Sequence, residues 1–250
     1  MAVSVEILKG FSILRDLPDA ALTELAAQSV LKRYSRREVV IDPGEQESNL
    51  CFLFEGSLQG VDFTLDGREV GLYFVRPGDF CGEVGLFGEQ SNPEFVVALA
   101  KSQVVLLPNA AVSQIMYETR PLIQGLSARL ARRVSEHTKQ RAILSLNSIP
   151  HRIYRQLVQL AGIENGFSER IEPGEGSRSC QSHKVTEDGC IDIAYPPTHQ
   201  EMAIMLNTSR ETVTRVFQAL QADGLVQRNG SSSLLIKKPE ALFQLAYGDD

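Results

Sequence analysis

The feature that most constrains the fold is a capping signal that opens a pair of short helices near residue 200. Thr198 lies three positions before Glu201, a spacing at which each side chain can accept a hydrogen bond from the other residue's backbone amide. Apolar residues then recur at helical spacing up to Asn207, a residue type that tolerates turn conformations. Thr208 or Ser209 caps a second helix. The pattern therefore predicts two helices joined by a tight turn.

The polar face of the second helix carries charged and hydroxyl side chains in its first two turns. Arg210 precedes Thr214 by four positions, and Glu211 precedes Arg215 by four, so each pair lies on one side of the helix. Arginine can bind guanine bidentately in the major groove, and a carboxylate can accept a hydrogen bond from cytosine. A solvated helix face with an ion pair would contain the same residues. The capped first helix and the tight turn favour a helix that reads DNA.

A β-hairpin is predicted after these helices. Apolar runs flank Asn229 and Gly230, a pair that is a strong hairpin signal. Arg228 lies beside this turn, where it could contact phosphates. The predicted DNA-binding residues are Arg210, Glu211, Thr214 and Arg215 on the second helix, Thr198 and Ser209 at the helix starts, and Arg228 on the hairpin.

The segment SRETVTR at residues 209–215 resembles the recognition helix of the cAMP receptor protein and FNR superfamily of bacterial transcription regulators. The resemblance extends over most of the chain. It implies a homodimer that binds double-stranded DNA at palindromic sites and has RNA polymerase as a partner. It also implies half-sites similar to TGTGA, in which Arg210 and Arg215 would bind guanines and Glu211 a cytosine.

Residues 1–120 are predicted to form a sensor domain. A helical pattern over residues 11–31 is followed, from residue 37 to 107, by period-two alternation with frequent glycine, which favours an antiparallel roll or barrel. The segment GEVGLF at residues 82–87 resembles the phosphate-binding cassette of cyclic-nucleotide-binding domains. The resemblance implies that Glu83 binds a ribose hydroxyl and that an arginine followed by serine or threonine binds the cyclic phosphate.

The phosphate-binding half of this cassette is altered, because Pro93 and Glu94 occupy the positions of that arginine and its neighbour. Proline supplies neither charge nor N–H, and a carboxylate repels an anion. By resemblance, His137 and Thr138 stand at the adenine-contacting positions. The predicted effector residues are Gly82, Glu83, Val84, His137, Thr138 and Arg141. The effector is unknown: cAMP, another small molecule, and a roll kept only as a scaffold all remain open.

Residues 121–147 are predicted to form one long dimerisation helix that begins at Pro121. Spacings of four and three, typical of a coiled-coil seam, connect Ile123, Ser127, Leu130, Val134, His137, Arg141 and Leu144. We therefore predict a parallel homodimer. His137 and Arg141 either meet an anionic effector or reach water where the coil splays. A solvated outer face is predicted for the basic residues Arg129, Arg132, Arg133 and Lys139.

Residues 148–250 are assigned to a winged helix-turn-helix domain. The whole chain is thus predicted to be an α+β protein: an N-terminal cyclic-nucleotide-binding-like β-roll, a long dimerisation helix, and a C-terminal winged helix-turn-helix.

The linker at residues 164–187 is polar and rich in glycine and serine. A zinc site from Cys180, His183 and Cys190 would need four ligands at tighter spacing, and His199 is a distant fourth, so no metal is predicted. Cys51 and Cys81 are expected in the core.

The charge of the chain is divided along its length. The net charge is -6, but residues 195–238 carry 5 basic and 3 acidic groups. DNA affinity depends on the charge of the face that meets the DNA and not on the net charge of the chain.

No apolar run approaches the ~18 residues of a membrane span, and no signal-peptide pattern is present. No Ser/His/Asp, metal-hydrolase or Walker pattern appears. We therefore expect a cytoplasmic regulator that is neither an enzyme nor bound to a membrane. A redox- or metal-sensing regulator, an effector-independent one, and a ligand-binding module with a vestigial DNA domain are the alternatives.

Overall fold

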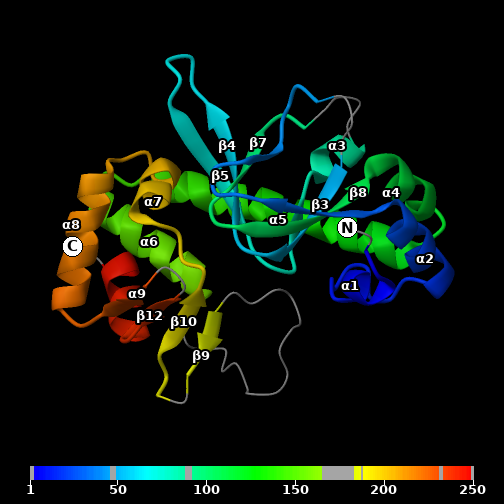
Figure 1. Ribbon diagram of the computed structural model, residues 1–250. Coiled ribbons are helices and arrows are strands. Elements are labelled where there is room, and N and C mark those ends of the chain that lie inside the picture. Colours follow the sequence, from blue (N-terminus) through cyan, green and yellow to red (C-terminus); the bar gives the residue numbers. More distant parts are fainter. Residues whose placement is uncertain are drawn as a thin grey trace. The chain divides into compact units, whose positions relative to one another are not determined.

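The computed structural model describes residues 3–45, 49–87, 92–164, 183–186, 188–230 and 233–248 (Figure 1). The chain divides into two units, residues 1–137 and residues 138–250, and one long helix, α5 (Arg120–Leu144), runs through the boundary. Within the described residues, no helix combines the length and apolar character needed to cross a membrane.

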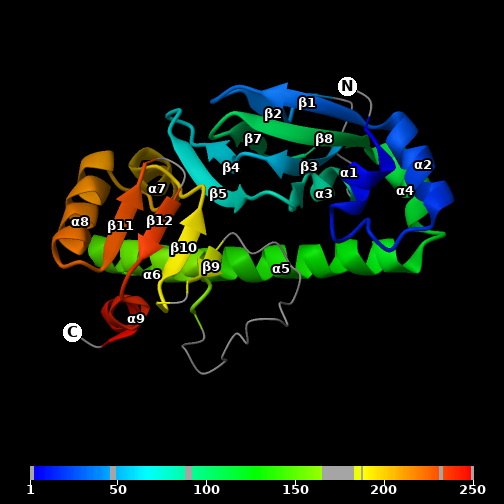
Figure 2. The same ribbon diagram turned by 60° about the horizontal axis from the view of Figure 1, so that its bottom comes forward.

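The first unit is built on a β-roll made of two four-stranded antiparallel sheets, in the orders β1-β8-β3-β6 and β2-β7-β4-β5. Its strands are β1 (Val30–Tyr34), β2 (Val39–Ile41), β3 (Asn49–Glu55), β4 (Leu58–Phe63), β5 (Glu69–Val75), β6 (Phe80–Cys81), β7 (Phe95–Ala98) and β8 (Ser102–Pro108). Its shorter helices are α1 (Val5–Lys9), α2 (Asp19–Gln28), α3 (Glu83–Phe87) and α4 (Asn109–Met116). The N-terminal part of α5 runs beside these strands (Figure 2).

Two apolar clusters hold the first unit together. One joins α1, α2, α4 and the start of α5 to the sheet that contains β3, with Phe52 and Leu126 fully buried in it. The other fills the space between the two sheets and contains Leu53, Tyr73 and Cys81. Cys51 is also buried and is the direct cross-strand partner of Cys81, so the prediction that both cysteines lie in the core is confirmed.

The helix predicted over residues 11–31 was wrong at both ends. Residues 11–17 form turns, α2 covers only Asp19–Gln28, and the chain then becomes strand β1. Ser29 is already extended, and Val30 pairs with Leu106 of β8. Backbone pairing across the sheet thus overrides the local helical pattern, as tertiary context often does. The period-two alternation predicted up to residue 107 ends in two separate strands, β7 and β8.

The second unit contains α6 (Ile149–Ala161), which Ser148 caps at its start and Gly162, with a φ of 70°, ends. Its sheet has the order β11-β12-β10-β9. The remaining elements are β9 (His183–Val185), β10 (Ile191–Ala194), α7 (His199–Met205), α8 (Arg210–Ala222), β11 (Val226–Asn229), β12 (Ser233–Ile236) and α9 (Pro239–Tyr247). The apolar side of α8 is buried within this unit, with Val213, Phe217 and Leu220 in the core.

The predicted hairpin is present as β11 and β12. Asn229 pairs with Ser233, so Asn229 belongs to the first strand and is its last residue. Gly230 has a φ of 65°, a conformation that favours glycine. Ser231 and Ser232 lie outside the described residues.

Candidate functional site

The predicted helix pair of residues 198–225 is present and capped as the sequence indicates. The Thr198 hydroxyl accepts from the Glu201 backbone N–H at 3.3 Å, and Glu201 Oε2 accepts from the Thr198 N–H at 2.8 Å. Asn207 occupies the turn with a φ of 49°, the left-handed region that asparagine tolerates. Ser209, rather than Thr208, caps α8 by accepting from the Thr212 N–H at 3.1 Å. The order helix, tight turn, helix is therefore confirmed.

The outward side of α8 brings together three of the predicted DNA-binding residues. Arg210, Glu211 and Arg215 are all exposed in the first two turns of the helix. Within the described part of the chain, none of their side chains makes an ion pair or a hydrogen bond with another residue. The ion pair that a purely solvated face would place between Glu211 and Arg215 is thus absent among these residues. Three side chains able to bind base edges are available on one helix face.

Thr214 contacts His199 within the unit, a contact that the sequence did not predict. The Thr214 hydroxyl donates to the Arg210 carbonyl at 2.9 Å, and His199 Nδ1 lies 2.9 Å from the same oxygen. Since the hydroxyl has only one hydrogen, Nδ1 donates in this arrangement. The His199 ring also packs against Phe217, with 4.7 Å between ring centroids. His199 therefore braces α7 against α8.

Burial lowers the pKa of His199, and the positive charges of Arg228 and Arg210 lower it further. The ring is consequently held in its neutral form near neutral pH. In that form one ring nitrogen carries a hydrogen, as the contact with Thr214 requires.

Arg228 has a structural role that its sequence position did not reveal. Its Nη2 donates to the carbonyls of Pro196 and Pro197 at 3.3 and 3.2 Å, and its Nε donates to the Gly230 carbonyl at 3.3 Å. These bonds tie β11 to the segment just before α7. Arg228 is half-buried, and burial lowers its pKa. A phosphate contact by Arg228 stays a prediction.

Two further side chains hold the end of α7, and neither was predicted. The Gln140 amide donates to the Met205 carbonyl at 2.9 Å, and Arg152 Nη1 donates to the Leu206 carbonyl at 3.4 Å. Both carbonyls belong to the last turn of α7, where a helix leaves carbonyls without internal partners. Gln140 lies on α5, so this helix reaches the helix pair through a direct hydrogen bond.

In the roll, the predicted effector residue Glu83 starts α3 immediately after Gly82. Gly82 has a φ of 91°, and a Cβ there would lie 2.4 Å from the Asn49 carbonyl oxygen, so only glycine fits. The Glu83 side chain is 2 % exposed, and its Oε1 lies 3.0 Å from both Nε and Nη2 of Arg133. The Nε contact has hydrogen-bond geometry. This buried carboxylate is therefore already paired with α5.

The prediction of a solvated basic face on α5 was wrong for two of its four members. Arg129 is 1 % exposed and Arg133 is 6 % exposed, whereas Arg132 and Lys139 are exposed as predicted. Arg129 Nη2 lies 2.8 Å from Asp79 Oδ2, and its Nη1 lies 3.4 Å from Glu136. Arg129 and Arg133 can be buried because Asp79 and Glu83 on the roll supply the counter-charges that buried cations need.

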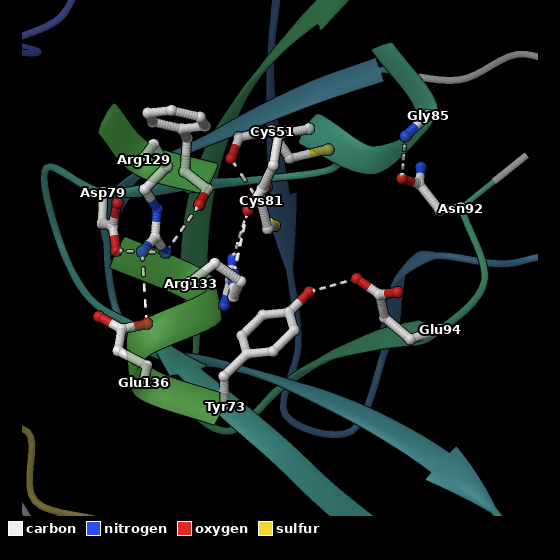
Figure 3. Close-up of polar contacts among 12 residues, drawn as sticks. Cys51, Tyr73, Asp79, Cys81, Gly85, Asn92, Glu94, Arg129, Arg133 and Glu136 are labelled. Atoms are coloured by element: carbon white, nitrogen blue, oxygen red, sulfur yellow. Dashed lines mark hydrogen bonds and ion pairs between the residues drawn. The ribbon is translucent and has the colours of Figure 1, made fainter. Parts of the chain in front are cut away.

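Tyr73 lies between Arg133 and Glu94 (Figure 3). The Arg133 guanidinium packs over its ring at 3.3 Å from the centroid, and its hydroxyl donates to Glu94 Oε1 at 2.7 Å. The predicted effector residue His137 lies edge-on to the same ring, with 6.0 Å between ring centroids. The structure therefore brings Glu83 and His137 to one place, and it adds Tyr73, Arg133 and Glu94.

Within the described residues, these contacts of Tyr73, Glu83 and Arg133 do not involve the remaining predicted effector residues. Val84, Thr138 and Arg141 are exposed, and the last two belong to the second unit. No group of three or more potential metal ligands occurs among the described residues. Cys180 lies outside those residues, His183 is part of β9, and Cys190 is half-buried.

Two known protein families match this chain. The cyclic nucleotide-binding domain matches residues 31–119, and the Crp-like helix-turn-helix domain matches residues 151–245. Among curated relatives, the cAMP-activated global transcriptional regulator CRP of Pasteurella multocida is 26% identical over 215 residues, which is 86% of this chain and 93% of the relative. The cAMP-activated global transcriptional regulator Vfr of Pseudomonas aeruginosa is 25% identical over 218 residues, 86% of this chain and 92% of the relative.

Solved structures share the fold. FixK2 from Bradyrhizobium japonicum is similar with a TM-score of 0.70 at 16% identity, over 89% of this chain and 99% of that one. A transcriptional regulator of the CRP family from Thermus thermophilus is similar with a TM-score of 0.62 at 25% identity, over 86% of this chain and 96% of that one. With both domains matched in the order that the fold shows, the chain belongs to the CRP and FNR superfamily of transcription regulators.

Proposed function

We propose that this protein regulates transcription as a homodimer that binds palindromic DNA through α8. The observation that carries the proposal is the exposed set Arg210, Glu211 and Arg215, which has no side-chain partner in the described part of the chain. Two arginines and a carboxylate in the first turns of a helix suit guanine and cytosine edges in the major groove. We therefore propose TGTGA-like half-sites, with Arg210 and Arg215 on guanines and Glu211 on a cytosine.

Thr198, Ser209, Thr214 and Arg228 have supporting parts in this proposal. Thr198 and Ser209 cap α7 and α8, so the backbone N–H groups at these helix starts are held where they could meet phosphates. Thr214 and Arg228 already bond within the unit. We expect them to position the recognition helix more than to select bases.

The proposed dimer uses the outer stripe of α5. The helix buries Leu122, Leu126, Arg129, Arg133, Gln140 and Ile143 within its own chain. Most residues of the predicted seam directly follow one of these buried residues in the sequence, so the seam lies on the neighbouring side of the helix. The seam is largely exposed, and Val134 is 66 % exposed. A second copy would bury this stripe and set two α8 helices against successive grooves. We propose residues 1–120 as the regulatory part, 121–147 as the dimer helix and 148–250 as the DNA-binding part.

The relatives' names describe cAMP-activated regulators, and we propose that cAMP activation does not extend to this chain. Glu94 stands at the position implied for phosphate contact and already accepts from Tyr73. The negative charge of Glu94 at this position would repel the phosphate of a cyclic nucleotide. We also propose RNA polymerase as a partner, the cytoplasm as the location, and no enzymatic activity.

Binding of Arg210→Ala to a set of DNA duplexes tests the proposal. Fluorescence anisotropy would compare a TGTGA palindrome with duplexes that differ at single base pairs. The variant should lose about 1 to 3 kcal/mol of binding at one base pair and show relaxed preference there. Gln221→Ala, in the last turn of the same helix, is the control and should bind like the wild type. An equal loss on every duplex would mean that Arg210 holds only phosphate.

A further inference from the structure

The Tyr73 ring occupies the inside of the roll in a space that a glycine keeps open. Tyr73 on β5 is the cross-strand partner of Gly60 on β4. A Cβ on Gly60 would lie 2.5 Å from Tyr73 Cζ, well inside van der Waals contact, so the ring lies directly over the glycine backbone. Glycine in a strand often marks such a close approach. The side chain is 5 % exposed, so the ring is a buried part of the roll.

The polar groups around this ring are the ones that would otherwise face an effector. Glu94, at the implied phosphate position, accepts the Tyr73 hydroxyl hydrogen at 2.7 Å. Glu83, at the implied ribose position, pairs with Arg133, whose guanidinium lies 3.3 Å from the ring centroid. His137, at an implied adenine position, meets the ring edge-on. A ligand that contacted all three positions would have to displace Tyr73.

Displacing the ring would leave charged groups in the interior with fewer partners. Arg133 Nη1 already has no hydrogen-bond partner among the described residues, so the aromatic face is one of its two main contacts beside Glu83. Burial raises the pKa of Tyr73 well above its usual value, so the hydroxyl stays protonated and can donate to Glu94. A cation over a buried aromatic face and a bonded carboxylate both favour the ring in place.

Arg133, which packs over the Tyr73 ring, is a residue of α5. Seven positions further along the same helix, on the same side, Gln140 donates to the Met205 carbonyl at the end of α7. The helix that Tyr73 holds to the roll is thus the helix that bonds to the helix-turn-helix. We propose that Tyr73 is a built-in occupant of the effector site, and that it keeps α5 bound to the roll without any nucleotide, so that DNA binding needs no effector. This inference rests on the proposed function.

The test compares full-length wild type, Tyr73→Ala and Tyr73→Phe by DNA-binding anisotropy. The wild type should bind a palindrome equally well with and without cAMP. Tyr73→Ala should bind about five- to 150-fold more weakly, the usual range of coupling between sites. Adding 4-methylphenol, which replaces the missing ring and hydroxyl, should restore its affinity. Tyr73→Phe keeps the ring and should bind without nucleotide. Tyr117→Ala is the control, because Tyr117 is 79 % exposed and should not respond to the phenol.

Thermal unfolding supplies a readout that does not depend on DNA. The phenol should raise the unfolding midpoint of Tyr73→Ala and leave that of the wild type unchanged, since a ligand stabilises only a folded state with a site for it. cAMP-dependent DNA binding by the wild type, full affinity of Tyr73→Ala without the phenol, or no response of this variant to the phenol would each overturn the inference. Failure of the wild type to bind any palindrome would instead overturn the proposed function. The unfolding comparison would still test whether the Tyr73 ring fills the effector site.

Discussion

Replacing Glu83 by glutamine tests whether a buried ion pair holds α5 to the roll. Glu83 and Arg133 are both buried, with Oε1 3.0 Å from Nε and from Nη2. The amide keeps the shape of the carboxylate but leaves the Arg133 charge without its counter-charge. Breaking a buried pair in this way costs about 3–5 kcal/mol. Each kcal/mol lowers the unfolding midpoint by roughly 2–8 °C in domains of this size range, so we expect a fall on the order of 10 °C.

Thermal unfolding followed by far-ultraviolet circular dichroism measures this fall. Asp19→Asn is the matched control, because Lys9 Nζ and Asp19 Oδ1 are 2.8 Å apart but well exposed, and exposed pairs contribute little. The double variant Glu83→Gln with Arg133→Gln should lose less than the sum of the single variants, since neither charge is then left alone. A single variant Glu83→Gln that unfolds within about 1 kcal/mol of the wild type would refute the buried pair.

Three further predictions concern other contacts. The pKa of His199 is lowered in the folded state. The contribution of the neutral ring to stability is therefore complete above the unfolded pKa of about 6.5 and is lost as the pH falls through the folded pKa. In His199→Gln, the unfolding midpoint should accordingly depend less on pH between about pH 8 and 5. Gly60→Ala places a Cβ 2.5 Å from Tyr73 Cζ and should destabilise the roll by about 1–3 kcal/mol in urea unfolding, and a neutral effect would show that the ring moves freely. Val134→Glu puts like charges across the proposed seam and should give monomers in sedimentation analysis, whereas a stable dimer would place the interface elsewhere.

Local features of the helix pair could be predicted from the sequence because their partners are close in the chain. Thr198 and Glu201 are three positions apart, and both capping bonds form. Asn207 takes the left-handed conformation that its position in a turn indicates. The apolar spacing of α8 likewise matches its buried side. Each of these features depends on bonding within a few residues, which a sequence pattern records directly.

The interior of the roll could not be predicted in the same way, because its contacts join distant residues. Glu83 and Arg133 are 50 positions apart. Arg129 and Arg133 continue the helical spacing of the buried Leu122 and Leu126, but this spacing does not identify the acidic partner that each buried arginine needs. The residue facing Tyr73 is Gly60 on the neighbouring strand, a pairing that only the register reveals. The structural role of His199 was not predicted because it depends on Thr214 and Phe217 of the next helix.

The most direct test of the central claim is a measurement of wild-type affinity for palindromes whose half-sites differ only in separation. If two copies of α8 enter successive major grooves, binding should be tightest when the half-site centres are about one helical turn, or 34–36 Å, apart. Inserting about five base pairs, half a turn, should abolish cooperative binding of the two half-sites. Equal affinity at every separation, or binding that ignores the half-site sequence, would contradict the account.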